Sequence, residues 1–264
     1  MLIMRSFKKT LSVVMALLLL AVCAVPALAA GDKATVSLRV EGLKDCLYYN
    51  DVTVDAGATV LDVLQAADES EESLTLTVVT TDYGPYLTAI NGLAAGTQTA
   101  TGWDGWQYHV DGADPGVGVS AYTVSDGEEI VVFYGDEWGE TGMFYPEIDL
   151  SAIDKGLVSF TATATEYDEN WNPTTVDVTL TGYTLYWDGK AYTPDDEGVC
   201  ELPVSALRDK THSVQIERYA ENGMPDILRY APDYTVEASV GFFARIALIF
   251  NRLFARIRAL FTRA

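Results

Sequence analysis

The sequence predicts an α+β N-terminal region, an all-β region after it and an amphipathic helix at the C-terminus. Three observations predict this order. Short segments in which apolar and polar residues alternate lie on both sides of one helical stretch, a second series of such segments follows without a helix, and residues 239–264 carry apolar residues at a helical spacing. Alternation is typical of half-buried strands, whereas a 3.6-residue spacing is typical of a helix with one buried face.

The first 29 residues have the features of a secretory signal peptide. Three basic residues precede an apolar run over residues 11–25, and the small residues Ala27 and Ala29 follow it. The run is too short to span a bilayer comfortably, and small residues two positions apart suit a signal peptidase. We therefore expect a secreted, extracellular chain that begins near Ala30.

Residues 30–136 are expected to form strand, strand, helix and then further strands. Thr59 and Asp62 are placed to cap the first turn of the helix, and Asn91-Gly92, Asp111-Gly112 and Asp126-Gly127 are dipeptides suited to tight turns. The expected strands cover residues 34–40, 48–54, 74–80, 86–90, 106–110 and 129–134, and the expected apolar helix face is Val60, Leu61, Val63, Leu64 and Ala67. This order is that of a ubiquitin-like β-grasp domain, in which a mixed sheet wraps over a single helix.

A glycine-rich and acidic stretch over residues 137–156 interrupts the alternation, and we expect a linker there. Residues 157–238 then carry short alternating segments with turn dipeptides between them. The expected strands cover residues 157–165, 175–180, 184–187, 199–203, 213–219 and 235–238. Such spacing predicts a small β-sandwich of the immunoglobulin or prealbumin type.

The charge distribution argues against nucleic acid as a partner. All 38 acidic residues lie in residues 30–238 together with nine of the 17 basic ones, which gives this part a net charge of −29. Such a field repels nucleic acid and favours solubility. Cys46 and Cys200 lie in different expected domains, and the sequence leaves open whether they form one bridge or stay reduced.

The sequence shows no catalytic apparatus. His109 and His212 fall in different expected domains, and no nucleophile elbow, phosphate-binding glycine loop or metal-binding helix motif is present. Acidic pairs lie beside turn residues, where solvated carboxylates are common. We therefore expect neither catalytic residues nor a metal site.

Four segments resemble the transcobalamin C-terminal-like family. They are ATVLDVL at residues 58–64, AING at 89–92, GWDGWQYHVDG at 102–112 and AYTVSDGEEI at 121–130, in the order that the family shows. The resemblance covers about residues 35–134 and implies a secreted bacterial β-grasp domain of largely unknown function. In the vitamin carriers of this family, cobalamin lies between such a domain and a helical barrel, but this sequence has no helical region for the barrel.

The same stretch supplies the candidate ligand-binding residues. Alternation places Trp106 and Tyr108 on one face of a strand, and two interpretations stay open: they pack against the helix, or they line an exposed aromatic ledge. The candidates are Tyr86, Trp103, Asp104, Trp106, Tyr108 and Asp111. Aromatic faces stack on sugar rings or on a corrinoid, and carboxylates accept hydrogen bonds from hydroxyl groups. If cobalamin binds, the resemblance points to Trp106 and Tyr108.

The C-terminal segment, residues 239–264, contains five arginines and no acid. At about 100° per residue, most of the arginines gather on one helical face and most of the phenylalanines on the opposite face. The candidate membrane-contact residues are Arg245, Phe250, Arg252, Phe254, Arg256, Phe261 and Arg263. Contact with an anionic membrane surface, docking on the chain's own sheets and association with a partner or second copy are the three alternatives.

Together these observations favour a non-enzymatic, envelope-associated binding or adhesion module with no resident cofactor. Its ligand would be an extracellular small molecule or glycan. The alternatives are a soluble carrier of cobalamin or a related corrinoid, a glycan-binding module, and a hydrolase whose site the sequence does not reveal.

Overall fold

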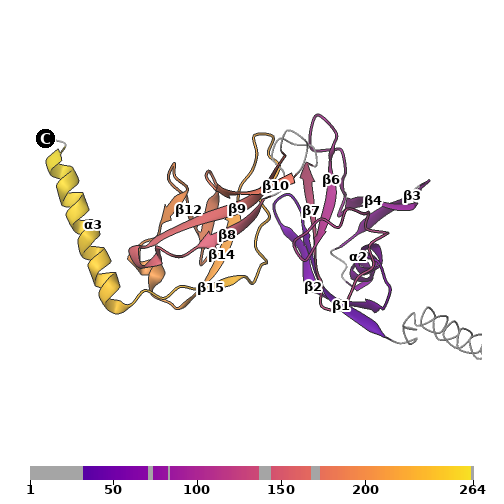
Figure 1. Ribbon diagram of the computed structural model, residues 1–264, viewed down its shortest axis with the longest axis horizontal. Helices are drawn as coiled ribbons and strands as arrows, with labels where there is room; N and C mark the ends of the chain where they lie inside the picture. The colour runs from indigo at the N-terminus through magenta and orange to yellow at the C-terminus, as the bar shows by residue number, and fades with distance from the viewer. Residues whose placement is uncertain (1–31, 71–73, 83, 137–143, 168–172, 263–264) are drawn as a thin grey trace, which may run out of the picture.

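The computed structural model describes residues 32–70, 74–82, 84–136, 144–167 and 173–262 (Figure 1). The expected signal peptide and residues 137–143 of the expected linker lie outside the described residues. Among the described residues there are two α-helices, α2 and α3, and the remaining regular structure is almost entirely β-sheet.

The first region is a mixed α+β unit, as the sequence predicted. Its elements are β1 (Lys33–Glu41), β2 (Cys46–Asp55), α2 (Val60–Ser70), β3 (Leu76–Thr81), β4 (Gly84–Ile90), β5 (Leu93–Ala94), β6 (Asp104–Val110) and β7 (Glu129–Asp136). The main sheet has the strand order β2-β1-β7-β6, with β1 and β7 parallel and the other pairs antiparallel. A smaller sheet has the order β3-β4-β5.

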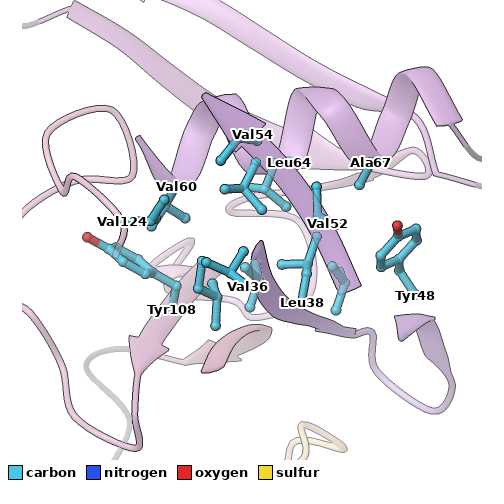
Figure 2. Packing of buried hydrophobic residues seen from close by; sticks show 14 of the residues in the cluster. Val36, Leu38, Tyr48, Val52, Val54, Val60, Leu64, Ala67, Tyr108 and Val124 are labelled. Atoms are coloured by element: carbon cyan, nitrogen blue, oxygen red, sulfur yellow. The ribbon is translucent and has the colours of Figure 1, made fainter. Parts of the chain in front are cut away.

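Helix α2 covers one face of the main sheet, and its predicted apolar face is confirmed. Val60, Leu61, Val63, Leu64 and Ala67 are all buried. All of them except Leu61 belong to one core cluster with inward side chains from alternate positions of β1, such as Val36 and Leu38, and from β2, such as Val52 and Val54 (Figure 2). Burial of aliphatic side chains on this scale is the main term that stabilises the unit.

The predicted cap at the start of α2 is also present. The Thr59 amide donates to Asp62 Oδ2 at 2.7 Å, and the Asp62 amide donates back to Thr59 Oγ1 at 3.3 Å. Two further amides of the first turn donate to the segment before β7, with Leu61 bonded to the Val119 carbonyl at 2.8 Å and Val60 to that of Tyr122 at 3.1 Å. These bonds satisfy donors that a helix start leaves unpaired, and they fix residues 119–122 against the helix.

The second region is all-β apart from two short 3₁₀ turns. Its elements are β8 (Tyr145–Asp149), η1 (Ile153–Lys155), β9 (Leu157–Tyr167), β10 (Pro173–Thr179), β11 (Thr184–Trp187), β12 (Lys190–Tyr192), β13 (Val199–Glu201), η2 (Val204–Leu207), β14 (Thr211–Glu217) and β15 (Thr235–Glu237). One sheet joins β10, β9, β13 and β8, and another has the order β12-β11-β14-β15. Phe160 of the first sheet and Leu185 and Ile216 of the second belong to one buried core.

Three short strands were not expected from the sequence. They are β5 and β12, each too short to show an alternating pattern, and β8, which lies within residues 137–156 where a linker was expected. β8 forms because it pairs with the long strand β9, from Tyr145 opposite Thr163 to Asp149 opposite Ser159. Pairing with a distant strand leaves little trace in the local sequence.

The two regions meet at the face of the main sheet that α2 leaves uncovered. Val131 and Phe133 of β7 form a small buried cluster with Leu228 and Tyr145 of the second region. Beside this cluster, Arg229 donates to Glu41 Oε2 through Nη2 at 2.6 Å and through Nε at 3.0 Å, and Arg39 Nη1 lies 3.5 Å from Glu41 Oε1. The sheet is therefore covered on both faces.

Helix α3 (Phe242–Thr262) is the C-terminal helix that the sequence predicted, and Figure 1 shows it at the opposite end of the molecule from α2. Its first two turns rest on the second region, where Leu248 is buried in the core and Ala244 packs against it. Within the described residues, neither helix is long and apolar enough to cross a membrane.

Candidate functional site

Two adjoining hollows lie where β4 passes β6 without pairing to it. We call the larger one, of about 470 Å³, the Trp103 hollow; its walls are Tyr86, residues 95–96 and residues 102–107. We call the other, of about 280 Å³, the Tyr108 hollow; its walls are residues 85–87 of β4, residues 106–109 of β6, Asp114, residues 117–120 and Val132. Both hollows share Tyr86, Trp106 and Gln107, so they form one groove beside β6.

The structure divides the predicted aromatic residues between core and surface. Tyr108 is core: it is only 8% exposed, and its hydroxyl donates to the Val117 carbonyl at 2.6 Å. Burial, followed by the charge of Asp114, raises the pKa of Tyr108 to about 12. Trp106 is half-buried, and its indole Nε1 donates to the Leu93 carbonyl at 2.9 Å while its ring contacts Tyr134 edge-on. Trp106 is thus held rigidly with part of its surface in the groove.

Tyr86 and Trp103 provide the exposed aromatic surface. They are 56% and 65% exposed, which is unusual for side chains of this size, and they lie at the Trp103 hollow. Exposed aromatic rings beside a concavity are typical of surfaces that contact a ligand. Together with the accessible part of Trp106, they make a partial ledge of the kind that the sequence suggested.

Asp104, a predicted ligand-binding residue, uses its carboxylate for hydrogen bonds within the protein. It is 3% exposed and accepts hydrogen bonds from the amides of Thr97, Gln98 and Thr99 at 3.1, 2.8 and 3.0 Å, from Thr99 Oγ1 at 2.6 Å and from the Tyr134 hydroxyl. Burial opposes ionisation, but these donors outweigh it and hold the pKa of Asp104 well below its usual range. Asp104 closes the loop of residues 96–104 instead of facing a ligand.

Asp111 lies outside both hollows. It occupies the turn after β6 with φ of 49°, and its Oδ1 accepts a hydrogen bond from the Glu129 amide at 2.9 Å. A short polar side chain tolerates this left-handed conformation, so the residue serves the turn. The structure instead places other polar side chains in the groove walls, among them Gln107 and Asp114. Sequence reasoning missed both, because the pairing of strands and loops that brings them there is not local.

The histidines and cysteines are embedded in packing. His109 stacks on Tyr145 with ring centroids 5.1 Å apart, and burial lowers its pKa although Asp114 acts in the opposite direction. His212 has both ring nitrogens engaged, Nδ1 with Asp188 Oδ2 at 2.8 Å and Nε2 with the Asp209 carbonyl at 3.0 Å. Both of its ring nitrogens are therefore committed within the fold.

Cys46 and Cys200 are both free thiols, which answers the question that the sequence left open. Burial, reinforced by the charge of Glu41, raises the pKa of the Cys46 thiol to about 12, and burial also raises that of Cys200. A thiol with a raised pKa is a poor nucleophile at neutral pH. In the part of the chain that the structure describes, no three His, Cys, Asp or Glu side chains are grouped closely enough to hold a metal ion.

The structure describes only some of the predicted membrane-contact side chains. Phe250 and Phe254 are 53% and 57% exposed, and Arg245 Nη1 reaches the Arg208 carbonyl at 3.4 Å. The side chains of Arg252, Arg256 and Phe261, and all of Arg263, lie outside the described residues. Leu248, which departs from the amphipathic pattern, is the residue that docks the helix on its own region.

Comparison with known families places residues from α2 to β7 in a described family. Residues 57–136 match the family described as a domain of unknown function, DUF4430. This segment contains α2, the groove and β7, and it lies within the part from which the resemblance to the transcobalamin C-terminal-like family was inferred. That resemblance is confirmed for this part of the chain. A search of the curated proteins found no match.

Among the solved structures that are similar to this chain, two each cover 40% of it. One is haptocorrin in complex with Cbi, with 25% sequence identity and a TM-score of 0.36, where the match spans 25% of the haptocorrin chain. The other is a protein from Ruminococcus gnavus ATCC 29149 that is described provisionally as metal-binding, with 15% identity and a TM-score of 0.31 over 99% of that chain.

Proposed function

We propose that this chain is a non-enzymatic binding module of the cell envelope and that the groove beside β6 is its ligand site. The observation that carries the proposal is the pair of adjoining hollows flanked by Tyr86 and Trp103, both more than half exposed. Two of the titratable groups near them, Tyr108 and Asp104, are committed to packing and to loop closure. A groove with fixed aromatic walls is suited to holding a partner, which favours a binding role.

The proposal includes a finer assignment of the fold. One helix over a mixed sheet in which β1 and β7 are parallel and central supports a β-grasp domain. Two four-stranded sheets around a common core support a β-sandwich of the immunoglobulin or prealbumin type for the second region. With the expected signal peptide at residues 1–29, this is the architecture of an exported domain followed by a spacer.

A carrier of cobalamin or a related corrinoid is the second candidate function. It is favoured by the sequence resemblance of residues 58–130 to the transcobalamin C-terminal-like family, together with the flat aromatic surface at the Trp103 hollow. A glycan would use the same rings, with Gln107 and Asp114 available as polar partners. Titration of the mature chain, residues 30–264, with cobalamins and with the glycans that bind in an array screen separates these candidates.

Substitution of the exposed rings tests the site itself. Tyr86→Ser and Trp103→Ser are each expected to weaken binding of the ligand so found by about tenfold, because each removes one face that stacks on the ligand. Both residues are exposed, so the melting temperature should stay unchanged within error. Tyr219→Ser, which removes an aromatic ring that is 38% exposed in the second region, is the matched control. Unchanged affinity in both groove variants would disprove the assignment of this site.

We further propose that α3 holds the module at an anionic membrane surface. After the docked first turns, the helix presents Ile249, Phe250, Leu253 and Phe254 at roughly half exposure. The segment around them contains five arginines and no acid, in a chain whose preceding part is strongly acidic. Apolar side chains that enter the headgroup region beside arginines that contact anionic lipids are the pattern of an interfacial helix.

The mature chain is accordingly expected to sediment with anionic liposomes and not with neutral ones. Changing Arg245, Arg252 and Arg256 together to Glu should abolish this binding, since each base near the surface contributes about 1 kcal/mol and each new acid is repelled. The same three positions changed to Lys keep the charge and should retain binding. Equal sedimentation with neutral liposomes would contradict the electrostatic part of the proposal.

A further inference from the structure

Strand β6 is the last strand of the main sheet, and its outer side is open in the middle. It pairs with β7 on one side, from Asp104 opposite Asp136 to Val110 opposite Ile130. On the other side β4 runs past without a ladder of hydrogen bonds between the two strands. An open strand side leaves backbone donors and acceptors available for another chain.

The hydrogen bonds at the two ends of β6 show which residues face outward. The Asp111 amide donates to the Glu129 carbonyl at 2.9 Å, so odd-numbered positions face β7. The Asp104 carbonyl accepts from Gly96, and Val110 exchanges bonds with Ala113, so even-numbered positions face away from β7. In an antiparallel pair the direction alternates residue by residue. The amide and carbonyl groups of Trp106 and Tyr108 therefore point outward.

These four groups have no hydrogen-bond partner on that side among the described residues. The bonded ends at Asp104 and Val110 leave five residues between them, a length of about 16 Å at ~3.3 Å per residue. The open stretch faces the Tyr108 hollow, whose opposite wall is formed by residues 85–87 and 117–120. The groove thus has the polar edge of a sheet on one side and a separate wall on the other.

The opposite wall is fixed in advance. Val117 accepts the Tyr108 hydroxyl bond at 2.6 Å, and the Val119 carbonyl accepts the bond from the Leu61 amide at the start of α2 at 2.8 Å. The segment that lines the hollow is therefore tied both to β6 and to the helix. A ligand that enters the groove does not have to order this wall, which lowers the entropic cost of binding.

We propose that the ligand of this groove is an extended, basic peptide segment of a partner protein, which adds to β6 as a further strand. This inference rests on the proposed function of the groove and names its ligand class. Four outward backbone groups match the hydrogen bonds that a single added strand can make, and side chains of the peptide can reach Tyr86 and the Tyr108 hollow. Asp114 in the wall and the net charge of −29 over residues 30–238 favour lysine and arginine in the peptide.

A display library of random dodecapeptides, selected on the mature chain, tests the proposal. The selected peptides should be rich in lysine, arginine and strand-forming residues. With the best of them at saturation, hydrogen exchange of the Trp106 and Tyr108 amides should slow at least tenfold. The amides of Gln107 and His109, which face β7, should exchange as before. In an added strand, every second amide of the peptide faces β6. N-methylation of the amides that face β6 should therefore abolish binding, and N-methylation of the other amides should leave it unchanged.

A blocking variant and its control complete the test. A side chain at Gly118 would meet open space in the groove wall, so Gly118→Phe should abolish peptide binding. Gly241→Phe also meets open space but lies beside α3, and it should bind like the unaltered chain. Unchanged exchange of Gln107 and His109 in Gly118→Phe would show that the sheet is intact.

No enriched peptide, or a peptide that binds without slowing exchange at Trp106 and Tyr108, would overturn the inference. Such a result would leave intact the binding of cobalamin or glycan and its dependence on Tyr86 and Trp103, which test the proposed function separately. Conversely, slowed exchange at Trp106 and Tyr108 together with loss of binding in Gly118→Phe supports the peptide even when neither of those ligands binds.

Discussion

Replacing Glu41 by alanine is expected to lower the free energy of unfolding by about 3–5 kcal/mol. Glu41 is 3% exposed and lies between the side chains of Arg39 and Arg229, which are 7% and 11% exposed. Removing the carboxylate leaves two guanidinium groups close together in a place that water does not reach. The cost is large because the remaining charges are uncompensated. Urea unfolding of residues 30–264, followed by tryptophan fluorescence, measures this loss of stability.

Two comparisons separate this interpretation from a general sensitivity to mutation. Asp55→Ala breaks the salt bridge between Lys33 and Asp55, whose side chains are 56% and 82% exposed. This change should lower the free energy of unfolding by about 0.5 kcal/mol or less. Replacing Arg39, Glu41 and Arg229 together by methionine or leucine should cost far less than Glu41→Ala alone, since no buried charge remains. A triple variant that is less stable than Glu41→Ala would show that the charges themselves hold the two regions together.

Asp104→Asn is expected to lower the free energy of unfolding at pH 7 by about 3–5 kcal/mol. Asn keeps one oxygen acceptor but places an NH₂ group among the donors of the loop at residues 97–99 and loses the charge that strengthens their bonds. The loop at residues 96–104 should loosen, and the Trp103 hollow should lose one wall. Asp111→Asn is the matched control, because Asn suits the turn equally well and the change should be nearly neutral.

The lowered pKa of Asp104 determines how the loss of stability in Asp104→Asn depends on pH. The pKa of Asp104 is lower in the folded chain than its unfolded value of about 3.9, so ionisation stabilises the fold above that value. This contribution is lost as the pH falls below about 4 toward the folded pKa. The difference in melting temperature between the unaltered chain and Asp104→Asn should therefore be largest near pH 7 and shrink between pH 4 and pH 3. A constant difference over this range would contradict the role assigned to the carboxylate.

Much of the first region could be predicted from sequence because its signals are local. The five buried positions of α2 are visible as a helical spacing, and Thr59 with Asp62 marks where the helix begins. Asn91-Gly92 and Asp111-Gly112 have positive φ at both residues, as tight turns demand, and Asp126-Gly127 has it at the glycine. Each of these features depends on residues no more than a few positions apart.

The candidate site was predicted only in part. The aromatic character of residues 103–108 is a sequence property, but which ring is buried depends on the loop that contacts it. Val117 accepts the Tyr108 hydroxyl bond and so places that ring in the core, while Trp103 stays exposed. Asp104 looked like a surface carboxylate beside two tryptophans, and only the fold brings five donors around it.

The sequence by itself determined the two-region order, the single helix over the first sheet, the turns and the amphipathic C-terminal helix, because periodicity, capping and turn chemistry act over a few residues. The tertiary structure decided which charged residues are buried, where β6 is left unpaired, and which side chains form the groove. Arg39 and Glu41 alternate with apolar residues as exposed strand positions do, yet they are buried, and Glu41 accepts hydrogen bonds from Arg229, almost two hundred residues later in the chain. Contacts between segments so distant in the chain depend on packing between whole sheets, which no local pattern encodes.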